Sequence, residues 1–171
     1  RTGMNVSNQK TVAKNSGVAR KSDIYSMLTL GEKGSLSANS GETWYTPAVT
    51  LTKIITGSEA SSIASKAIKE QAALYKLKLP EGNSWQAAQF EVDYKGCSAS
   101  PYINVDITGV DGKQLVYRGV KASQNTYDAT GSGNTTMTVF YAVPNGCKEY
   151  VLKFGGSSEY AIPAAYYLIK P

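Results

Sequence analysis

The residues of this chain with the clearest chemical potential are its two cysteines, Cys97 and Cys147, each of which follows a glycine. Each also lies just beyond a stretch that predicts a β-strand, residues 90–94 before the first and residues 137–143 before the second. Because the chain has no third cysteine and no histidine, the pair indicates one structural disulfide rather than a metal or catalytic site. We expect this bond to clip two strand-end loops together at one edge of the fold. The alternative is a pair of free, buried thiols.

The absence of histidine from the sequence narrows the catalytic possibilities further. It removes the usual general base and the commonest metal ligand, and with them the serine–histidine and cysteine–histidine nucleophiles. A serine and a lysine are spaced four apart at Ser62 and Lys66, without the motif that accompanies serine–lysine enzymes. We interpret them as surface residues of a helix.

Carboxylates are the remaining candidates for acid–base chemistry. Glu91 and Asp93 lie two residues apart on one face of a predicted strand, with side chains about 7 Å apart. Asp106 could face them from a neighbouring strand. Two such carboxylates could then act together, as the catalytic pair of a glycosidase does. The plainer interpretation is the solvated face of an amphipathic sheet. A calcium site needs several oxygen ligands in one loop, whereas Asp106, Asp111 and Asp128 are scattered, so we predict no catalytic residue, no metal and no cofactor.

Exposed aromatic side chains offer a different chemistry, which is stacking against a sugar ring or docking to a protein partner. Trp44 and Tyr45 lie beside a predicted turn, and Trp85 follows another. We take these three as candidate ligand-binding residues, with packing in the core as the alternative for the tryptophans. Tyr166 and Tyr167 are adjacent, so at least one of them points outward.

Composition sets the limits of the fold and of its partners. The 171 residues, 42% of them hydrophobic, suffice for one core. Tyrosines outnumber phenylalanines 12 to 3, which suits half-buried sheet faces. The net charge of +5 is spread along the chain, which argues against nucleic acid and leaves an anionic surface polymer as a possible partner. No stretch approaches the length of a transmembrane segment.

The pattern along the chain predicts a polar leader or linker over residues 1–22 and one domain over residues 23–171. A first strand through residues 11–13 is the alternative for the leader. Within the domain, short strands are predicted at residues 24–30 and 75–79, and a helix at residues 58–71 capped by Ser58. The second half alternates as half-buried strands do, with a hairpin turn at residues 110–113. Seven to nine short strands favour a two-sheet sandwich.

A family resemblance rests on the order of several segments. Gly41-Glu42 leads into Trp44 and residues 49–55, residues 89–94 precede Asp111-Gly112-Lys113, and residues 137–143 run into Pro144 and then residues 151–154. This order, over about residues 24–169, resembles the telokin-like, immunoglobulin-type domains of secreted proteins and lipoproteins of Gram-positive bacteria. That family is of unknown function and is similar in fold to a secreted mycobacterial immunoprotective antigen. The resemblance implies export, and it supplies no catalytic residues.

We therefore predict an all-β, immunoglobulin-like antiparallel β-sandwich with one short inserted helix. The chain begins at Arg1 rather than at a methionine, which we interpret as loss of a signal peptide or lipid anchor. The predicted function is that of a secreted or surface-exposed, non-catalytic bacterial domain for adhesion or protein–protein interaction at the cell envelope. A carbohydrate-binding module or an extracellular glycan-acting enzyme is the alternative.

Overall fold

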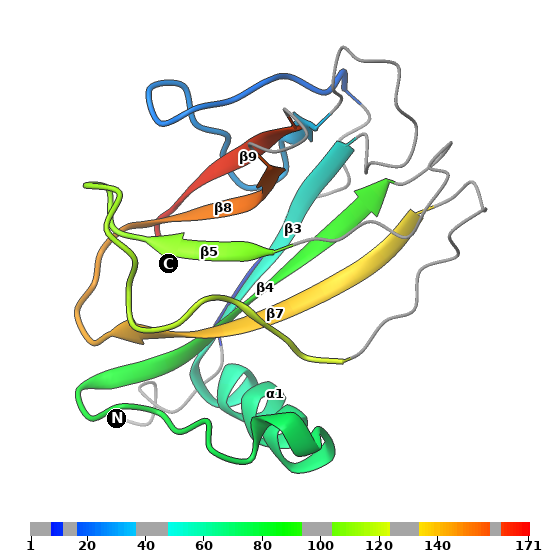
Figure 1. The fold of residues 1–171 in the computed structure, drawn as a ribbon. Coiled ribbons are helices and arrows are strands. Elements are labelled where there is room, and N and C mark those ends of the chain that lie inside the picture. Colours follow the sequence, from blue (N-terminus) through cyan, green and yellow to red (C-terminus); the bar gives the residue numbers. More distant parts are fainter. Residues whose placement is uncertain (1–7, 12–16, 37–47, 94–103, 124–133, 158–161) are drawn as a thin grey trace.

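The computed structural model describes residues 8–11, 17–36, 48–93, 104–123, 134–157 and 162–171. Two β-sheets lie face to face, and a helix covers one end of the larger sheet on its outer side (Figure 1). This arrangement confirms the predicted all-β sandwich with one inserted helix. Within the described residues, no helix is both long enough and apolar enough to cross a bilayer.

All pairings between the named strands are antiparallel. The larger sheet has the order β1 (Asn8–Thr11), β3 (Ala48–Thr56), β4 (Asn83–Asp93), β7 (Asn134–Pro144) and β6 (Val120–Lys121), and β2 (Lys33–Ser35) pairs with the other end of β3. The smaller sheet has the order β5 (Val105–Thr108), β8 (Tyr150–Ser157) and β9 (Ile162–Ile169).

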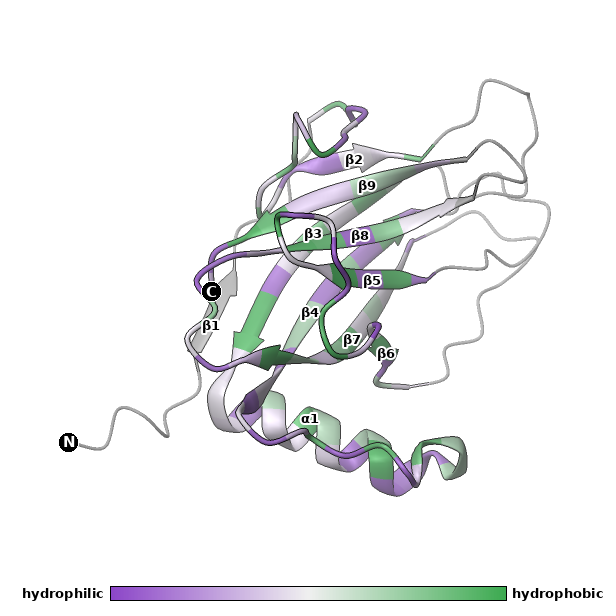
Figure 2. Cartoon of the chain, turned by 60° about the vertical axis from the view of Figure 1, so that its left-hand side comes forward, coloured by the Kyte–Doolittle hydropathy of each residue, from purple (hydrophilic) through white to green (hydrophobic). Residues whose placement is uncertain are grey.

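The main core fills the space between the two sheets. Alternate residues of β4 and β5 point into it, as the sequence pattern predicts, because successive side chains of a strand point to opposite faces. Phe90 of β4 meets Phe154 of β8 with ring centroids 4.8 Å apart and Tyr167 of β9 at 6.1 Å. Figure 2 shows the resulting alternation of hydrophobic and hydrophilic residues along the strands of the larger sheet.

Three tyrosines are fully buried in this core rather than half-buried on a sheet face. Tyr141 and Tyr150 form a hydrogen bond of 2.8 Å between their hydroxyls, and Tyr150 also donates to Gln86 Oε1 at 2.7 Å. Tyr167 donates to the backbone carbonyl of Glu32 at 2.7 Å. Burial raises the pKa of Tyr141, Tyr150 and Tyr167 well above the ordinary range, so all three hydroxyls stay protonated.

Helix α1 (Gly57–Glu70) confirms the predicted helix, although Thr56 rather than Ser58 occupies the N-cap position. The buried side of α1 consists of Ala60, Ala64 and Ala67. These small side chains pack in one cluster with Trp85 and with small and aromatic residues of β4 and β7. The alanine-rich composition is therefore explained by close packing of the helix against the sheet.

Two predicted strands are wrong. Residues 24–30 form a turn with isolated bridges, because Ile24 and Tyr25 stay exposed while Leu28 alone is buried against β9. Residues 75–79 follow the short 3₁₀ helix η2 (Ala72–Leu74) as irregular chain. Leu77 packs against the cluster beneath α1, so the alternation there reflects contact with the helix region and not strand pairing.

The stretch predicted as a leader contributes structure to the larger sheet. β1 pairs with the last residues of β3, and Arg20 forms a bridge to Gly34 of β2. At Gly34 a Cβ atom would lie 2.9 Å from Ala165 Cβ and 2.7 Å from Leu28 Cδ1, so a larger residue there would force these neighbours to shift. The domain limits at residue 22 stay a prediction.

Candidate ligand-binding hollow

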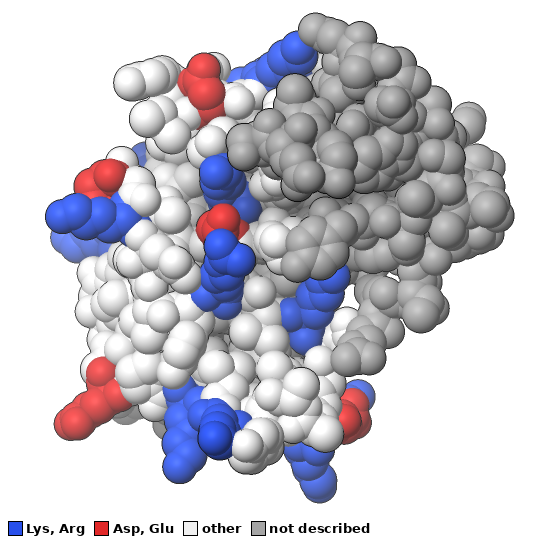
Figure 3. Space-filling view, viewed as in Figure 1, with Lys and Arg blue, Asp and Glu red and all other residues white. Residues whose placement is uncertain are grey.

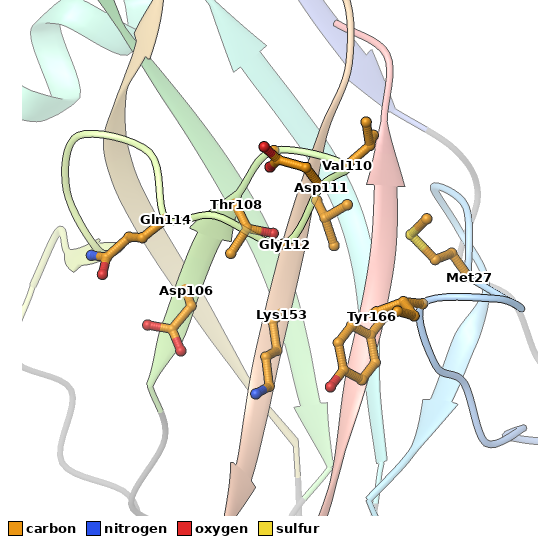
Figure 4. Close-up of a pocket in the computed structure, with 12 residues that line it drawn as sticks. Met27, Asp106, Thr108, Val110, Asp111, Gly112, Gln114, Lys153 and Tyr166 are labelled. Carbon is orange, nitrogen blue, oxygen red and sulfur yellow. The ribbon is translucent and has the colours of Figure 1, made fainter.

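Three polar side chains form a row across the outer face of the smaller sheet. Asp106 on β5 pairs with Lys153 on β8, and Lys153 pairs with Tyr166 on β9. Their neighbours Ile107 and Leu152 are fully buried on the inner face, so strand alternation directs the row outward. Figure 4 shows the three side chains on the same side of the sheet.

This row is the floor of a hollow of about 380 Å³ that lies between two turns. One wall is the turn at residues 23–27, which contributes Ile24 and Met27, and the other is the hairpin turn after β5, which contributes Val110 and Asp111. Ile24 and Val110 are both exposed, and Figure 4 shows the side chain of Val110 beside Asp111. We call this feature the outer hollow.

The hairpin turn after β5 confirms the turn predicted from the sequence. The N–H of Gly109 donates to the Lys113 carbonyl at 2.9 Å, and the Lys113 N–H donates to Asp111 Oδ1 at 3.0 Å. Gly112 has a φ of 81°, in the left-handed region that favours glycine. The turn therefore holds Val110 and Asp111 at the rim of the outer hollow.

The opposite turn is fastened by Arg20. Its guanidinium donates to the carbonyls of Ser26 at 3.2 Å and Met27 at 2.8 Å and forms an ion pair of 3.1 Å with Glu32. Desolvation raises the pKa of Glu32, but the hydrogen bonds from Arg20 and from Thr29 outweigh it and hold the pKa below its ordinary value. The rim residues Ile24 and Met27 are thus carried by a braced loop.

The acidic and basic groups at and beside the outer hollow balance each other in charge. Arg118 Nε forms an ion pair of 3.0 Å with Asp106 Oδ1, an oxygen that is itself buried. Apart from this ion pair, the oxygen accepts no hydrogen bond from the described residues. The Lys153 ammonium lies 5.7 Å from the centre of the Tyr166 ring, a cation–π contact. Figure 3 shows acidic and basic side chains intermingled on the described surface in this view.

The carboxylates considered in the sequence are not brought together. Glu91 and Asp93 lie on the outer face of the larger sheet, because Phe90 and Val92 between and beside them face the core. Asp106 lies on the outer face of the smaller sheet. The possibility that Asp106 faces the other two is therefore wrong, since the whole sandwich separates them.

The aromatic candidates have different outcomes. Trp85 is only 8% exposed and meets Phe140 edge-to-face at 5.3 Å, so its ring belongs to the cluster beneath α1 and is closed to a ligand. Trp44 and Tyr45 lie outside the described residues, as does Asp128. Of the adjacent pair Tyr166 and Tyr167, the first lines the outer hollow and the second is buried.

The structure contains no disulfide among its described residues. Cys147 is a free thiol whose Sγ donates to the Glu149 carbonyl at 3.2 Å, and Cys97 lies outside the described residues. The expectation that the two cysteine-bearing strand ends share one edge is wrong, because β4 and β7 are antiparallel. Their register pairs Asp93 with Asn134 and Asn83 with Pro144, so β4 and β7 end about 33 Å apart over ten residue steps. A disulfide needs Cα atoms within about 7 Å.

Sequence reasoning missed Lys153 and Arg118 as site residues. The alternation of Leu152, Lys153 and Phe154 was a signal that Lys153 faces outward. Its alignment with Asp106 and Tyr166 depends on the register of three strands, which is set by contacts far apart in the sequence.

Comparison with protein-family models, with curated proteins and with solved structures finds no match for this chain. Among the described residues, no group of three or more histidine, cysteine, aspartate or glutamate side chains is placed to hold a metal ion. The functional interpretation consequently starts from the geometry of the outer hollow.

Proposed function

We propose that this chain is a non-catalytic binding domain of the bacterial cell envelope or extracellular space, and that its ligand occupies the outer hollow. The observation that carries the proposal is the row of Asp106, Lys153 and Tyr166 across three strands, enclosed between two braced turns. A concave site with apolar walls and a few convergent polar groups is the usual form of a ligand site.

Binding rather than turnover is favoured by how the charged groups are engaged. Arg118 neutralises Asp106, and the Lys153 ammonium rests against the Tyr166 ring. Groups that are already engaged with each other suit a fixed binding surface better than proton transfer. A glycan-acting enzyme remains the competing proposal, with Asp106 as the residue to test.

The location outside the cell and the telokin-like, immunoglobulin-type family are parts of the same proposal. They are supported by the resemblance in the order of strands and turns and by the two-sheet architecture. A disulfide does not add to this support, because Cys147 is a free thiol in the structure. The net charge of +5 favours attraction to the anionic bacterial surface.

The test is co-sedimentation of the purified protein with isolated Gram-positive cell-wall sacculi. We expect the wild type to pellet and the double variant Lys153→Ala/Tyr166→Ala to stay in the supernatant. The chain offers a matched control, because Lys76 lies 5.4 Å from the centre of the exposed Tyr75 ring. The double variant Lys76→Ala/Tyr75→Ala removes the same groups outside the hollow and should pellet like the wild type.

Three results would overturn the proposal. The first is a wild type that does not pellet, and the second is pelleting that is lost only in the control variant. The third is release of soluble fragments from the sacculi by the wild type but not by Asp106→Asn, which would establish the enzyme instead. Thermal melts of each variant exclude unfolding as the cause of lost binding.

A further inference from the structure

We infer that the ligand of the outer hollow is a neutral, polyhydroxylated sugar chain. This inference rests on the proposed function, since it names the chemical class of the ligand for the same site. Three features carry it, which are the balance of charge, the row of polar groups with its aromatic ring, and the occupied edges of the smaller sheet.

The balance of charge disfavours a polyanion. Two carboxylates, Asp106 and Asp111, and two cationic groups, Lys153 and Arg118, lie at or beside the hollow. Arg118 is already engaged by Asp106, and the Lys153 ammonium lies against Tyr166. An anionic polymer would therefore meet as much repulsion as attraction at this face.

The polar groups of the row can donate and accept hydrogen bonds together. The Asp106 side chain is 28% exposed although its Oδ1 is buried and paired with Arg118 at 3.0 Å, so the accessible part of this carboxylate is its other oxygen. A sugar hydroxyl can donate to this oxygen and accept from Lys153 at the same time, because a hydroxyl is both donor and acceptor. Gln114, which also lines the hollow, adds an amide with both capacities.

The spacing and the aromatic ring fit an extended neutral ligand. Asp106, Lys153 and Tyr166 lie on three adjacent strands, so the row spans about 10 Å at the usual distance between strands. The Tyr166 ring offers an apolar surface with a polar tip beside the hydrogen-bonding groups. Stacking at one end and hydrogen bonding along the row would bind successive sugar units.

An extended peptide is disfavoured because the edges of the smaller sheet are occupied. The N–H groups of Leu115 and Gly119 donate to carbonyls of β5, each at 2.8 Å. At the other edge, Leu28 donates to the Tyr166 carbonyl at 2.7 Å and accepts from Leu168 at 2.9 Å. A peptide that adds a strand needs a free edge, so recognition in the hollow must use side chains.

Isothermal titration calorimetry with three soluble probes tests the inference. The probes are a tetramer of N-acetylglucosamine, cellotetraose and inorganic polyphosphate. We expect at least one of the neutral sugars to bind and polyphosphate to bind more weakly. Asp106→Asn should weaken sugar binding about tenfold, because a hydrogen bond to a charged group is replaced by a neutral one. Lys76→Ala/Tyr75→Ala should leave it unchanged.

Salt dependence gives a second, independent readout. Affinity for the neutral sugar should change less than about threefold between 50 and 300 mM NaCl, since screening acts on charged ligands. Tighter binding of polyphosphate, with a steep fall in salt, would overturn the inference, as would sugar binding unaffected by Asp106→Asn and Tyr166→Ala. If no sugar binds but sacculi still require Lys153 and Tyr166, the sugar inference fails while the proposed function stands.

Discussion

The hydroxyl of Tyr141 donates its proton to the hydroxyl of Tyr150, 2.8 Å away in the core. The direction follows because the single proton of Tyr150 is used for Gln86 Oε1 at 2.7 Å. Tyr150 belongs to the smaller sheet, and Tyr141 and Gln86 belong to the larger one. The relay therefore links the two layers of the sandwich by polar contacts inside an apolar core.

This relay predicts unequal costs for two similar substitutions. Tyr150→Phe leaves both the Tyr141 hydroxyl and Gln86 Oε1 without this partner, so we expect a loss of about 2–4 kcal/mol in the free energy of unfolding. Tyr141→Phe keeps the bond from Tyr150 to Gln86 and should cost only about 1 kcal/mol. Urea unfolding of the two variants measures the difference, and equal losses would contradict the assigned direction.

Glu32 predicts a specific dependence of stability on acid. Its pKa in the folded protein lies below the ordinary value of 4.5, so its contribution is fully present above that pH. It is lost as pH falls through the folded-state pKa. Because Arg20 and Glu32 are both partly exposed, we expect less than about 1 kcal/mol from the pair.

The measurement is urea unfolding of wild type and Glu32→Gln between pH 3 and 7. The variant should be less stable at pH 7, and the difference should shrink towards pH 3. A difference that grows as pH falls would mean that Glu32 titrates in the opposite sense. Glu81→Gln serves as the control, since this exposed carboxylate on another turn is not part of the Arg20 contacts.

Gly112 predicts a conformational rather than a steric penalty. Its φ is 81°, and a Cβ atom there would meet nothing within 4 Å. Gly112→Ala should therefore cost about 1 kcal/mol through backbone strain alone. Gly112→Asn should cost less, because asparagine tolerates the left-handed region. Thermal unfolding would contradict this if asparagine and alanine were equally destabilising.

The free thiol of Cys147 predicts the outcome of alkylation. Denatured protein treated with iodoacetamide without reductant should gain two carbamidomethyl groups by mass spectrometry. The reason is that Cys147 is a free thiol and that β4 and β7, the strands before the two cysteines, end far from each other. Protein that gains alkyl groups only after reduction would contradict this and restore the predicted disulfide.

Local patterns predicted the parts of the fold that depend on neighbours in the sequence. The alternation in β4 and β5, the turn at Gly112 and the alanine-rich helix α1 were all predictable on this basis. The same approach failed for residues 24–30. The apolar residues of this segment are spaced as in a strand, but only Leu28 is fully buried in the structure.

The candidate site was harder to predict because it depends on strand pairing. Whether two strand ends meet depends on the relative direction of the strands. Antiparallel pairing separates the ends of β4 and β7, after which the two cysteines follow in the sequence. Asp106 was considered for the wrong partners, since its true neighbours across the sheet are Lys153 and, beyond it, Tyr166. Trp85 was considered for a ligand although α1 covers it.

Amide chemical-shift mapping with soluble fragments of digested sacculi tests the central claim most directly. We predict that the largest shifts in ¹H–¹⁵N spectra fall on residues 24–27, 106–114, 153 and 166, around the outer hollow. Residues of α1 and of the outer face of the larger sheet, such as Gln89, should not move. Shifts concentrated on α1 or around Gln89 would contradict the assignment of the outer hollow as the binding site.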